Sequence, residues 1–350
     1  MSTALLFILV LVLLIFVHEL GHFIIAKLSG MKVEEFGFGF PPKLLKFKRG
    51  ETTYSLNLLP LGGFVKILGE EGGSKDPRSF TQKSVLKRIA VLVAGVAMNF
   101  VLAIILLTVA YKMGTTPLAL DADKLSGTKV SDIYIADIMK DSAAQKSDFQ
   151  VGDILKGYSS ISDFQAFTKE NAGKEVSINI KRGSSDVIKN VALNAGDSPL
   201  GVAIIEVTSV KQPLPRAFLT ATADTYASTT MITKVLGRSL KQLVVSGKAS
   251  DEIKQATGPI GIYKFTGQVA KLGFVYVLQF IALLSINLGL INILPFPALD
   301  GGRVVFVALE GVFKKKVVRE QIENIIHTVG FILLIALILI ITLRDIIKYY

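Results

Sequence analysis

Four long apolar stretches constrain the fold of this chain more than any other feature. They cover roughly residues 4–26, 89–111, 273–295 and 325–343, and each is close to the ~20 residues that an α-helix needs to cross a bilayer. Of the 350 residues, 51% are hydrophobic and 19% are charged, a more apolar balance than soluble proteins have. We therefore expect an α-helical membrane protein with four transmembrane helices and room for one extramembrane domain.

The first stretch could instead be a cleaved signal peptide. It lacks the basic n-region and the small-x-small cleavage site of such peptides, and it contains the run FVHELGHFI at residues 16–24. A charged side chain costs about 2.5–3.5 kcal/mol at the centre of a membrane helix. We therefore interpret the stretch as a retained helix that carries a working site.

The distribution of charge predicts the orientation in the membrane. Residues 27–88, between the first two stretches, hold 12 Lys or Arg against 6 Asp or Glu, and five basic residues lie between the last two stretches. The positive-inside rule puts both loops in the cytoplasm, so that both termini and residues 112–272 face outward. The net charge of +11 comes without a basic helix or an aromatic-basic platform, so we expect the lipid bilayer and no nucleic acid as a partner.

Residues 118–208 have a different sequence pattern from the long apolar stretches. Short alternating runs such as VSINIKR and VIKNVAL are separated by Gly, Asp and Ser clusters, which predicts a compact α+β domain. The order of the segments resembles a PDZ domain: the pattern SPAAxAGLxxGDxI corresponds to Asp141–Ala144 followed by Val151–Leu155. Ser147-Asp148-Phe149 departs from the usual Ala-Gly-Leu. A generic small β-rich domain is the alternative interpretation.

Two further segments have recognisable patterns. TTYSLNLL and GFVKIL, on either side of PLGG, predict a β-hairpin at residues 52–68. Because an isolated hairpin is marginally stable in water, we expect it to rest on the membrane domain. After Pro213 and Pro215, apolar residues at helical spacing predict an amphipathic helix over about 216–245 that packs or lies at the interface.

The motif HELGH carries the chemistry. On a helix, positions i and i+4 share a face, so His18 and His22 can bind one metal ion while Glu19 stands beside it. The chain has no cysteine, so any transition metal must be held by His, Asp or Glu. The alternative is a coincidental polar stripe in a helix bundle without a metal ion. Burying polar groups without partners costs free energy, which disfavours this alternative.

A catalytic zinc ion takes three protein ligands and one water. His327, the third histidine, is a candidate by residue type. Asp300, in NILPFPALDGG, is favoured by topology, because the first and third helices both run inward and Asp300 lies at the depth of HELGH. The prolines before Asp300 break the helix, and the glycines after it allow a tight turn. We expect Asp300 as the ligand and His327 as a helix cap or anchor.

The chain resembles the site-2 protease family of intramembrane zinc metalloproteases in three features. These are HELGH near the N-terminus, NxxPxPxLDGG near the C-terminus and a PDZ-like insertion between them. The resemblance is to its bacterial branch that includes the regulator of sigma-E protease. DPRSFTQKSVLKR and GPIGIY are also similar to family segments. Ala94-Gly95-Val96 departs from the family's Ala-Gly-Pro, whereas Asn99-Phe100 keeps its pattern.

The resemblance implies a Zn2+ ion on His18, His22 and Asp300, with Glu19 as general base and acid. The implied substrates are single-span membrane proteins, such as anti-sigma factors or remnant signal peptides, already shortened by an upstream site-1-type protease. The implied location is the bacterial inner membrane. We also expect Asn287 and Asn292 to bind the unwound substrate backbone, with helix-to-helix hydrogen bonding as the alternative role.

The predicted organisation has four parts: a membrane catalytic half at 1–111, the PDZ-like domain at 118–208, an amphipathic helical connector at 213–270 and a second membrane catalytic half at 273–350. Two other functions remain open. A membrane metal transporter could use HELGH as a transit site, although transport needs ionisable groups at several depths. A PDZ-type membrane adaptor could carry a non-catalytic metal site.

Overall fold

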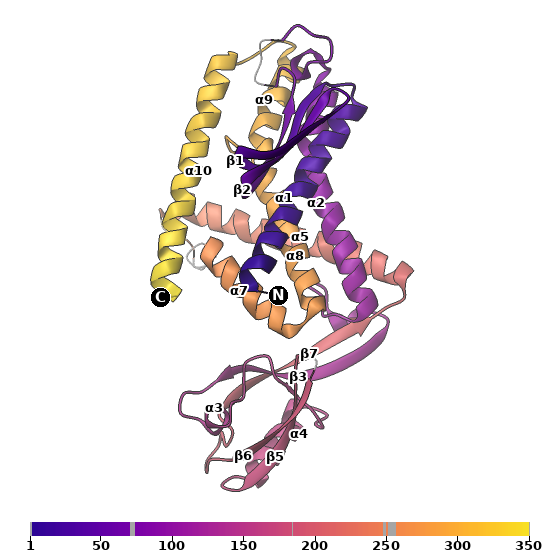
Figure 1. Cartoon of the computed structure of the whole chain (residues 1–350). Coiled ribbons are helices and arrows are strands. Elements are labelled where there is room, and N and C mark those ends of the chain that lie inside the picture. Colours follow the sequence, from indigo (N-terminus) through magenta and orange to yellow (C-terminus); the bar gives the residue numbers. More distant parts are fainter. Residues whose placement is uncertain (1, 71–73, 184, 248–249, 251–256, 350) are drawn as a thin grey trace. The chain divides into compact units, whose positions relative to one another are not determined.

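The computed structural model describes residues 2–70, 74–183, 185–247, 250 and 257–349, and Figure 1 shows the chain coloured along its sequence. The chain divides into two compact units. Unit 1 comprises residues 1–106, 225–267 and 280–350, and unit 2 comprises residues 107–224 and 268–279.

Four described helices are long and apolar enough to cross a bilayer: α1 (Thr3–Leu28), α2 (Val85–Met113), α8 (Phe274–Asn292) and α10 (Glu320–Tyr349). The prediction of a multi-pass α-helical membrane protein is thereby confirmed. α8 ends short of the predicted residue 295, because Pro295 has no amide hydrogen for a helix and restricts the residue before it.

A two-stranded antiparallel sheet in unit 1 consists of β1 (Val33–Arg49) and β2 (Thr52–Ile67). The predicted pairing of TTYSLNLL with GFVKIL is wrong, because residues of β1 lie between them: Phe36 pairs with Tyr54 on one side and with Val65 on the other. Glycine permits this insertion. A Cβ at Gly37 would lie 2.3 Å from the Phe64 ring, so GFGF fits where a bulkier segment would not.

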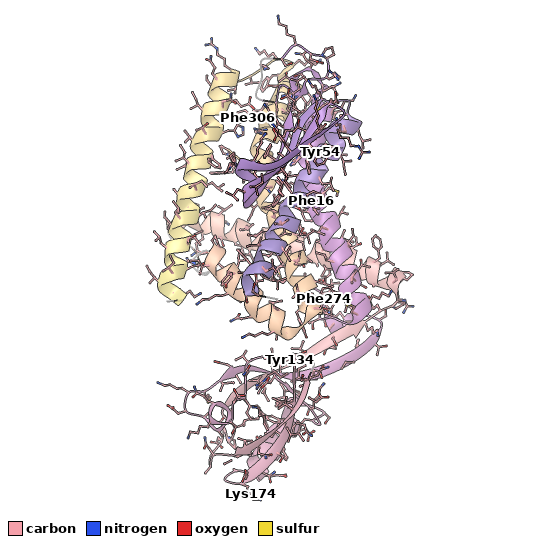
Figure 2. The ribbon with its side chains drawn as sticks, in the orientation of Figure 1. Phe16, Tyr54, Tyr134, Lys174, Phe274 and Phe306 are labelled. Carbon is pink, nitrogen blue, oxygen red and sulfur yellow. The ribbon has the colours of Figure 1, made fainter. Side chains whose placement is uncertain are left out.

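The sheet rests on the C-terminal half of α1 (Figure 1). The ring centroid of Phe36 lies 5.8 Å from that of Phe16 and 5.1 Å from that of Phe23, both in α1. Tyr54 joins this aromatic cluster, and Figure 2 labels Phe16 and Tyr54. The packing brings the end of β2 alongside the HELGH segment.

Further described elements, most of whose residues belong to unit 1, connect these helices along the chain. A short 3₁₀ turn (Phe80–Gln82) precedes α2, α5 (Leu214–Ser246) contains the predicted amphipathic segment, and α7 (Pro259–Leu272) and α9 (Asp300–Phe313) flank α8. Asp345 near the end of α10 accepts the N–H groups of Gly258 and Gly261 at the start of α7. Residues 248–249 and 251–256 of the predicted connector lie outside the described residues.

Unit 2 contains a five-stranded antiparallel sheet with the strand order β6-β5-β4-β3-β7. The strands are β3 (Thr128–Ile138), β4 (Ile154–Leu155), β5 (Glu175–Arg182), β6 (Ser185–Ala192) and β7 (Val202–Lys211), with α3 (Ala143–Lys146), α4 (Ile161–Glu170) and a 3₁₀ turn (Ala122–Lys124). Inward residues of these strands and helices form one buried apolar core. Asp153, from the GD pattern, is 1% exposed and paired with Arg182.

Candidate metal centre

Two imidazoles converge on one face of α1. His18 and His22 are 7% and 9% exposed, and their Nε2 atoms are 3.2 Å apart. The four-residue spacing produces this approach, because side chains at i and i+4 lie one above the other on a helix. Two unprotonated nitrogens this close repel each other unless a proton or a metal ion lies between them.

Asp300 completes the group. Its Oδ2 lies 3.1 Å from the His18 Nε2 and 3.3 Å from the His22 Nε2. Within the described residues, these three side chains are the one group of three possible metal ligands, with ligand atoms within 4.8 Å of one another. Burial alone would raise the pKa of the Asp300 carboxyl, but its contacts with the two imidazoles lower this pKa below its ordinary value.

The chain path explains why Asp300 stands there. It is the first residue of α9, directly after the turn that contains Pro295 and Pro297. A Cβ at Gly301 would lie 2.2 Å from the carbonyl oxygen of Ile293, and a Cβ at Gly302 would lie 2.4 Å from that of Phe296. The glycines therefore let the first turn of α9 pack against the main chain that follows α8.

α2 forms the third wall of the site, which sequence reasoning missed. A Cβ at Gly95 would lie 2.3 Å from the His22 Nε2 and 2.9 Å from the His18 Nε2. A Cβ at Gly21 would lie 2.4 Å from the carbonyl oxygen of Ala94, so α1 and α2 cross at very close range. A glycine inside a helix is unfavourable by about 1 kcal/mol relative to alanine, and this is the signal that could have pointed to Gly95.

Each imidazole has a polar partner at its other nitrogen. The Nδ1–H of His22 donates to the carbonyl oxygen of Val91 over 2.8 Å. The Nδ1 of His18 lies 3.1 Å from the Nδ2 of Asn99, which is fully buried. Partners of this kind orient metal-binding histidines and set which nitrogen carries the proton.

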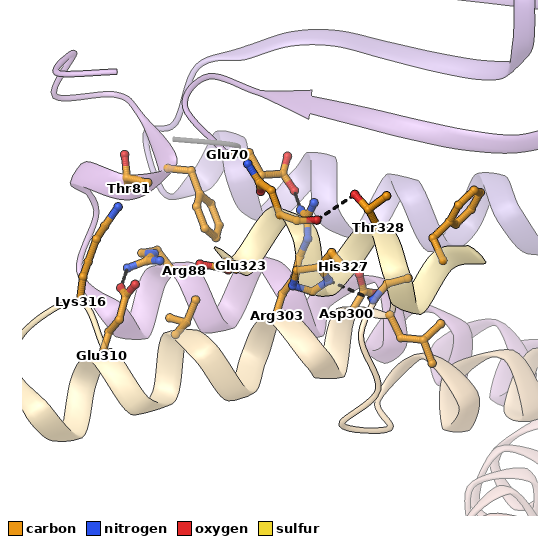
Figure 3. A pocket seen from close by; sticks show the side chains of 16 residues that line it. Glu70, Thr81, Arg88, Asp300, Arg303, Glu310, Lys316, Glu323, His327 and Thr328 are labelled. Carbon is orange, nitrogen blue, oxygen red and sulfur yellow. Dashed lines mark hydrogen bonds and ion pairs between the residues drawn. The ribbon is translucent and has the colours of Figure 1, made fainter. Parts of the chain in front are cut away.

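His327 does not join the group of ligands. Its Nδ1 accepts the backbone N–H of Ala298 over 2.9 Å, as Figure 3 shows. Ala298 has a φ of +76°, a left-handed conformation that is unfavourable for an alanine. His327 therefore stabilises the strained turn that delivers Asp300, an anchoring role close to the one expected for it.

A cavity of about 660 Å³ opens beside the group. Its lining includes Glu19, the end of β2 at residues 63–67, and the ion pair between Glu70 and Arg303. The same ion pair lines a second cavity of about 560 Å³, which also contains the ion pair of Arg88 with Glu310 (Figure 3). Charged side chains therefore extend from the HELGH segment to α9.

The two asparagines singled out in the sequence lie on α8. The Nδ2 of Asn287 donates to the carbonyl oxygen of Leu283 over 3.0 Å, within the same helix. Asn292 is the last residue of α8 and is partly exposed. Among the described residues that line the two cavities, neither asparagine appears.

Comparison with known proteins decides the class of this chain. The profile of peptidase family M50 matches residues 6–337. The chain belongs to this peptidase family. The prediction of an intramembrane metalloprotease is thereby confirmed, and neither the transporter nor the adaptor is favoured.

The relatives of this M50 peptidase align along nearly the whole chain. A Clostridium perfringens protein named as a zinc metalloprotease is 37% identical over 95% of both chains. The zinc metalloprotease RasP of Oceanobacillus iheyensis is 32% identical over 99% of both chains. The regulator of sigma-W protease RasP of Bacillus subtilis is 28% identical over 99% of this chain and 98% of its own.

Proposed function

We propose that His18, His22 and Asp300 hold the zinc ion of this M50 peptidase, and that Glu19 is its general base and acid. One observation carries the proposal. Ligand atoms from α1 and from a segment 282 residues later in the chain lie within 4.8 Å of one another, in the cavity that Glu19 also lines. Zn2+ is the cofactor, as the names of the relatives specify.

The donor set fits zinc. Bonds of about 2.0–2.1 Å at tetrahedral angles separate neighbouring ligand atoms by about 3.3 Å. The three separations here are 3.1, 3.2 and 3.3 Å. Two imidazoles and one carboxylate are a common protein contribution to catalytic zinc, which would keep one further position for water. All three side chains line the cavity.

The chain's own residues then do the proton transfers. Bound zinc supplies a Lewis acid for the scissile carbonyl and brings the pKa of water to about 7. Glu19 takes the proton from the attacking water and returns it to the leaving amine. Gly63 keeps the space beside Glu19 open, because a Cβ there would lie 2.9 Å from the Glu19 Cγ.

The proposed substrates are single-span membrane proteins cut near the cytoplasmic side. Their helix must unwind before attack, and the released backbone groups need new partners. Residues 63–66 of β2 pair with β1 and also line the cavity, so a substrate strand could add there through main-chain hydrogen bonds. We include Asn287 and Asn292 as further partners, with the Oδ1 of Asn287 as the acceptor, since its Nδ2 is bonded to Leu283.

Residues 118–208 are proposed to be a PDZ-like gate outside the cell membrane. The gate would exclude substrates whose bulky outer domain has not yet been removed by an upstream protease. A small groove of about 150 Å³ lies between α4 and residues 197–204, beside β7 at the edge of the sheet. A newly made C-terminus could add to β7 as a further strand at this groove, a weaker role than exclusion.

The proposed orientation places both termini and residues 118–208 on the outer side of the bacterial inner membrane. The excess of Lys and Arg over residues 27–88 supports it, because positively charged loops stay in the cytoplasm. On this orientation the metal group lies at the cytoplasmic ends of α1 and α8. The four parts predicted at 1–111, 118–208, 213–270 and 273–350 are kept as the proposed domain organisation.

The test separates metal binding from catalysis. Glu19→Gln should keep one zinc ion per chain and lower the cleavage of a transmembrane model substrate by at least about 100-fold, because it cannot take the proton. Glu175→Gln, an exposed site on β5, is the matched control. Metal analysis and cleavage assays of the purified chain, with and without a chelator, provide the readout. Normal cleavage by the Glu19 variant would reject its role.

A further inference from the structure

Only one of the two polar atoms in the fully buried side chain of Asn99 has a hydrogen-bond partner among the described residues. Its Nδ2 lies 3.1 Å from the Nδ1 of His18. Its Oδ1 is buried and has no hydrogen-bond partner among the described residues. A buried amide oxygen without a partner is unfavourable, so this arrangement calls for a physical reason.

Metal binding determines which end of the amide suits His18. The Nε2 of His18 faces the His22 Nε2 and the Asp300 Oδ2, at 3.2 and 3.1 Å, so Nε2 is the atom that would bind a metal ion. A neutral imidazole that binds metal through Nε2 carries its proton on Nδ1. That Nδ1–H needs an acceptor, and only the oxygen of the Asn99 amide is one.

His22 already has the Nδ1–H acceptor that a metal-binding imidazole needs. Its Nδ1–H donates to the carbonyl oxygen of Val91, which can only accept. The partner of His18 is different, because a half-turn of the Asn99 amide exchanges its oxygen and nitrogen with almost no change in shape. The metal-free imidazole can therefore accept from Nδ2, and the metal-bound imidazole can donate to Oδ1.

We propose that Asn99 is a positioning residue of the metal centre, whose Oδ1 accepts the Nδ1–H of His18 in the zinc-loaded enzyme. The amide then fixes the tautomer that leaves Nε2 of His18 free for the metal, and Oδ1 gains the partner that it lacks. Asn99 does not touch substrate or metal. The inference rests on the proposed zinc site and assigns a role within it.

Helix packing is the rival role for Asn99. Its backbone oxygen accepts the hydroxyl of Ser285 on α8 over 2.8 Å. A Cβ at Gly289, also on α8, would lie 3.6 Å from the Cβ of Asn99. Loss of this contact between α2 and α8 could disturb the site without any direct effect on His18, so the experiment must separate the two roles.

Three variants of the full-length chain in detergent make the separation. Asn99→Leu keeps the number of side-chain heavy atoms and removes the acceptor, and Asn99→Asp keeps an acceptor. Ser285→Ala removes only the hydrogen bond from Ser285 on α8 to the Asn99 backbone on α2. Zinc affinity is measured by competition with a chelator, and the visible spectrum of the cobalt-loaded protein reports the ligand geometry. Melting temperatures of the chelator-treated proteins report the fold.

A positioning role predicts that Asn99→Leu weakens zinc binding by about 10- to 100-fold, the usual effect of losing such a partner. Asn99→Asp should bind zinc as tightly as the wild type or more tightly, and Ser285→Ala within about twofold. A zinc affinity of Asn99→Leu equal to that of the wild type would overturn the inference. Equal losses of zinc affinity in all three variants would also overturn it. If Asn99→Leu does not fold, Asn99→Ala takes its place with the same expected loss.

The outcome for the wild type is separate. A wild-type chain that binds no zinc rejects the proposed function itself, whereas zinc binding that is indifferent to Asn99 rejects only this inference.

Discussion

Two carboxylates, one fully buried in unit 2 and one partly buried in unit 1, have opposite surroundings. Asp224 of unit 2 is fully buried and receives four hydrogen bonds, from the Tyr111 hydroxyl and from three consecutive backbone N–H groups at residues 118–120. Asp300 of unit 1 faces the two imidazole nitrogens of His18 and His22. Backbone donors satisfy the first carboxylate, whereas the second shares its space with two other potential metal ligands.

The difference distinguishes an anchor from a binding site. Hydrogen bonds from the chain itself compensate the charge of Asp224, so that no further group is needed there. The lone pairs of Asp300 and the two imidazoles converge on one point, where a metal ion, or a proton on an imidazole, would satisfy them together. Burial alone therefore does not identify a working carboxylate, because the nature of its partners decides.

The largest expected contrast comes from the same substitution at both positions. Asp300→Asn should abolish cleavage and weaken zinc binding by more than about 100-fold, since a neutral amide is a poor zinc ligand. Asp224→Asn should keep zinc and lower the free energy of unfolding by about 2–3 kcal/mol, because an amide N–H₂ then meets backbone donors. Metal analysis and denaturant unfolding in detergent measure both effects. The comparison fails if Asp224→Asn loses zinc while remaining folded.

A smaller change tests the space around the metal group. Gly95→Ala should reduce zinc content and cleavage at least tenfold, because the added methyl would overlap the imidazole nitrogens of His18 and His22. Gly237→Ala is the control, since a Cβ at this helical position meets no atom within 4 Å. Alanine favours helices, so the control should be neutral or slightly more stable. Equal zinc content in both variants would show that α2 does not border the metal.

The smallest effect concerns a third carboxylate, at the surface of unit 2. Hydrogen bonds from Lys189, Arg182 and Gln150 lower the pKa of Asp148 to about 2. A lowered pKa in the folded state means that the stabilisation is complete above about pH 4, the ordinary value, and is lost as the pH falls toward 2. Because 67% of this side chain is exposed, the loss should be small.

Denaturant midpoints of the chelator-treated chain at pH 5 and pH 2.5 measure this effect. Asp148→Asn should show a smaller drop between the two pH values than the wild type does. An equal drop in both proteins would assign the acid sensitivity to other groups and leave Asp148 without a role in it.

Local patterns were sufficient for much of the fold and for half of the candidate site. The four spans follow from apolar runs of membrane length, and the approach of His18 to His22 follows from helical spacing. The prediction of Asp300 required more than spacing. It rested on the directions of the first and third apolar helices, and the resemblance to a known family implied the same residue.

The features that the sequence did not predict depend on contacts between distant segments. The insertion of Phe36 between two runs of β2 depends on the space that Gly37 leaves for Phe64. Asn99 and Gly95 matter because α2 crosses α1 at the height of the imidazoles. No periodicity within α2 specifies that height, since the crossing depends on the packing of both helices.

Zinc K-edge X-ray absorption of the purified wild-type chain would measure the central claim most directly. The expected spectrum is that of a four-coordinate ion with two imidazole nitrogens, one carboxylate oxygen and one water oxygen. A third imidazole could come only from His327, the one other histidine of the chain. Its appearance, or a protein purified without zinc, would contradict a metal centre built from α1 and the start of α9.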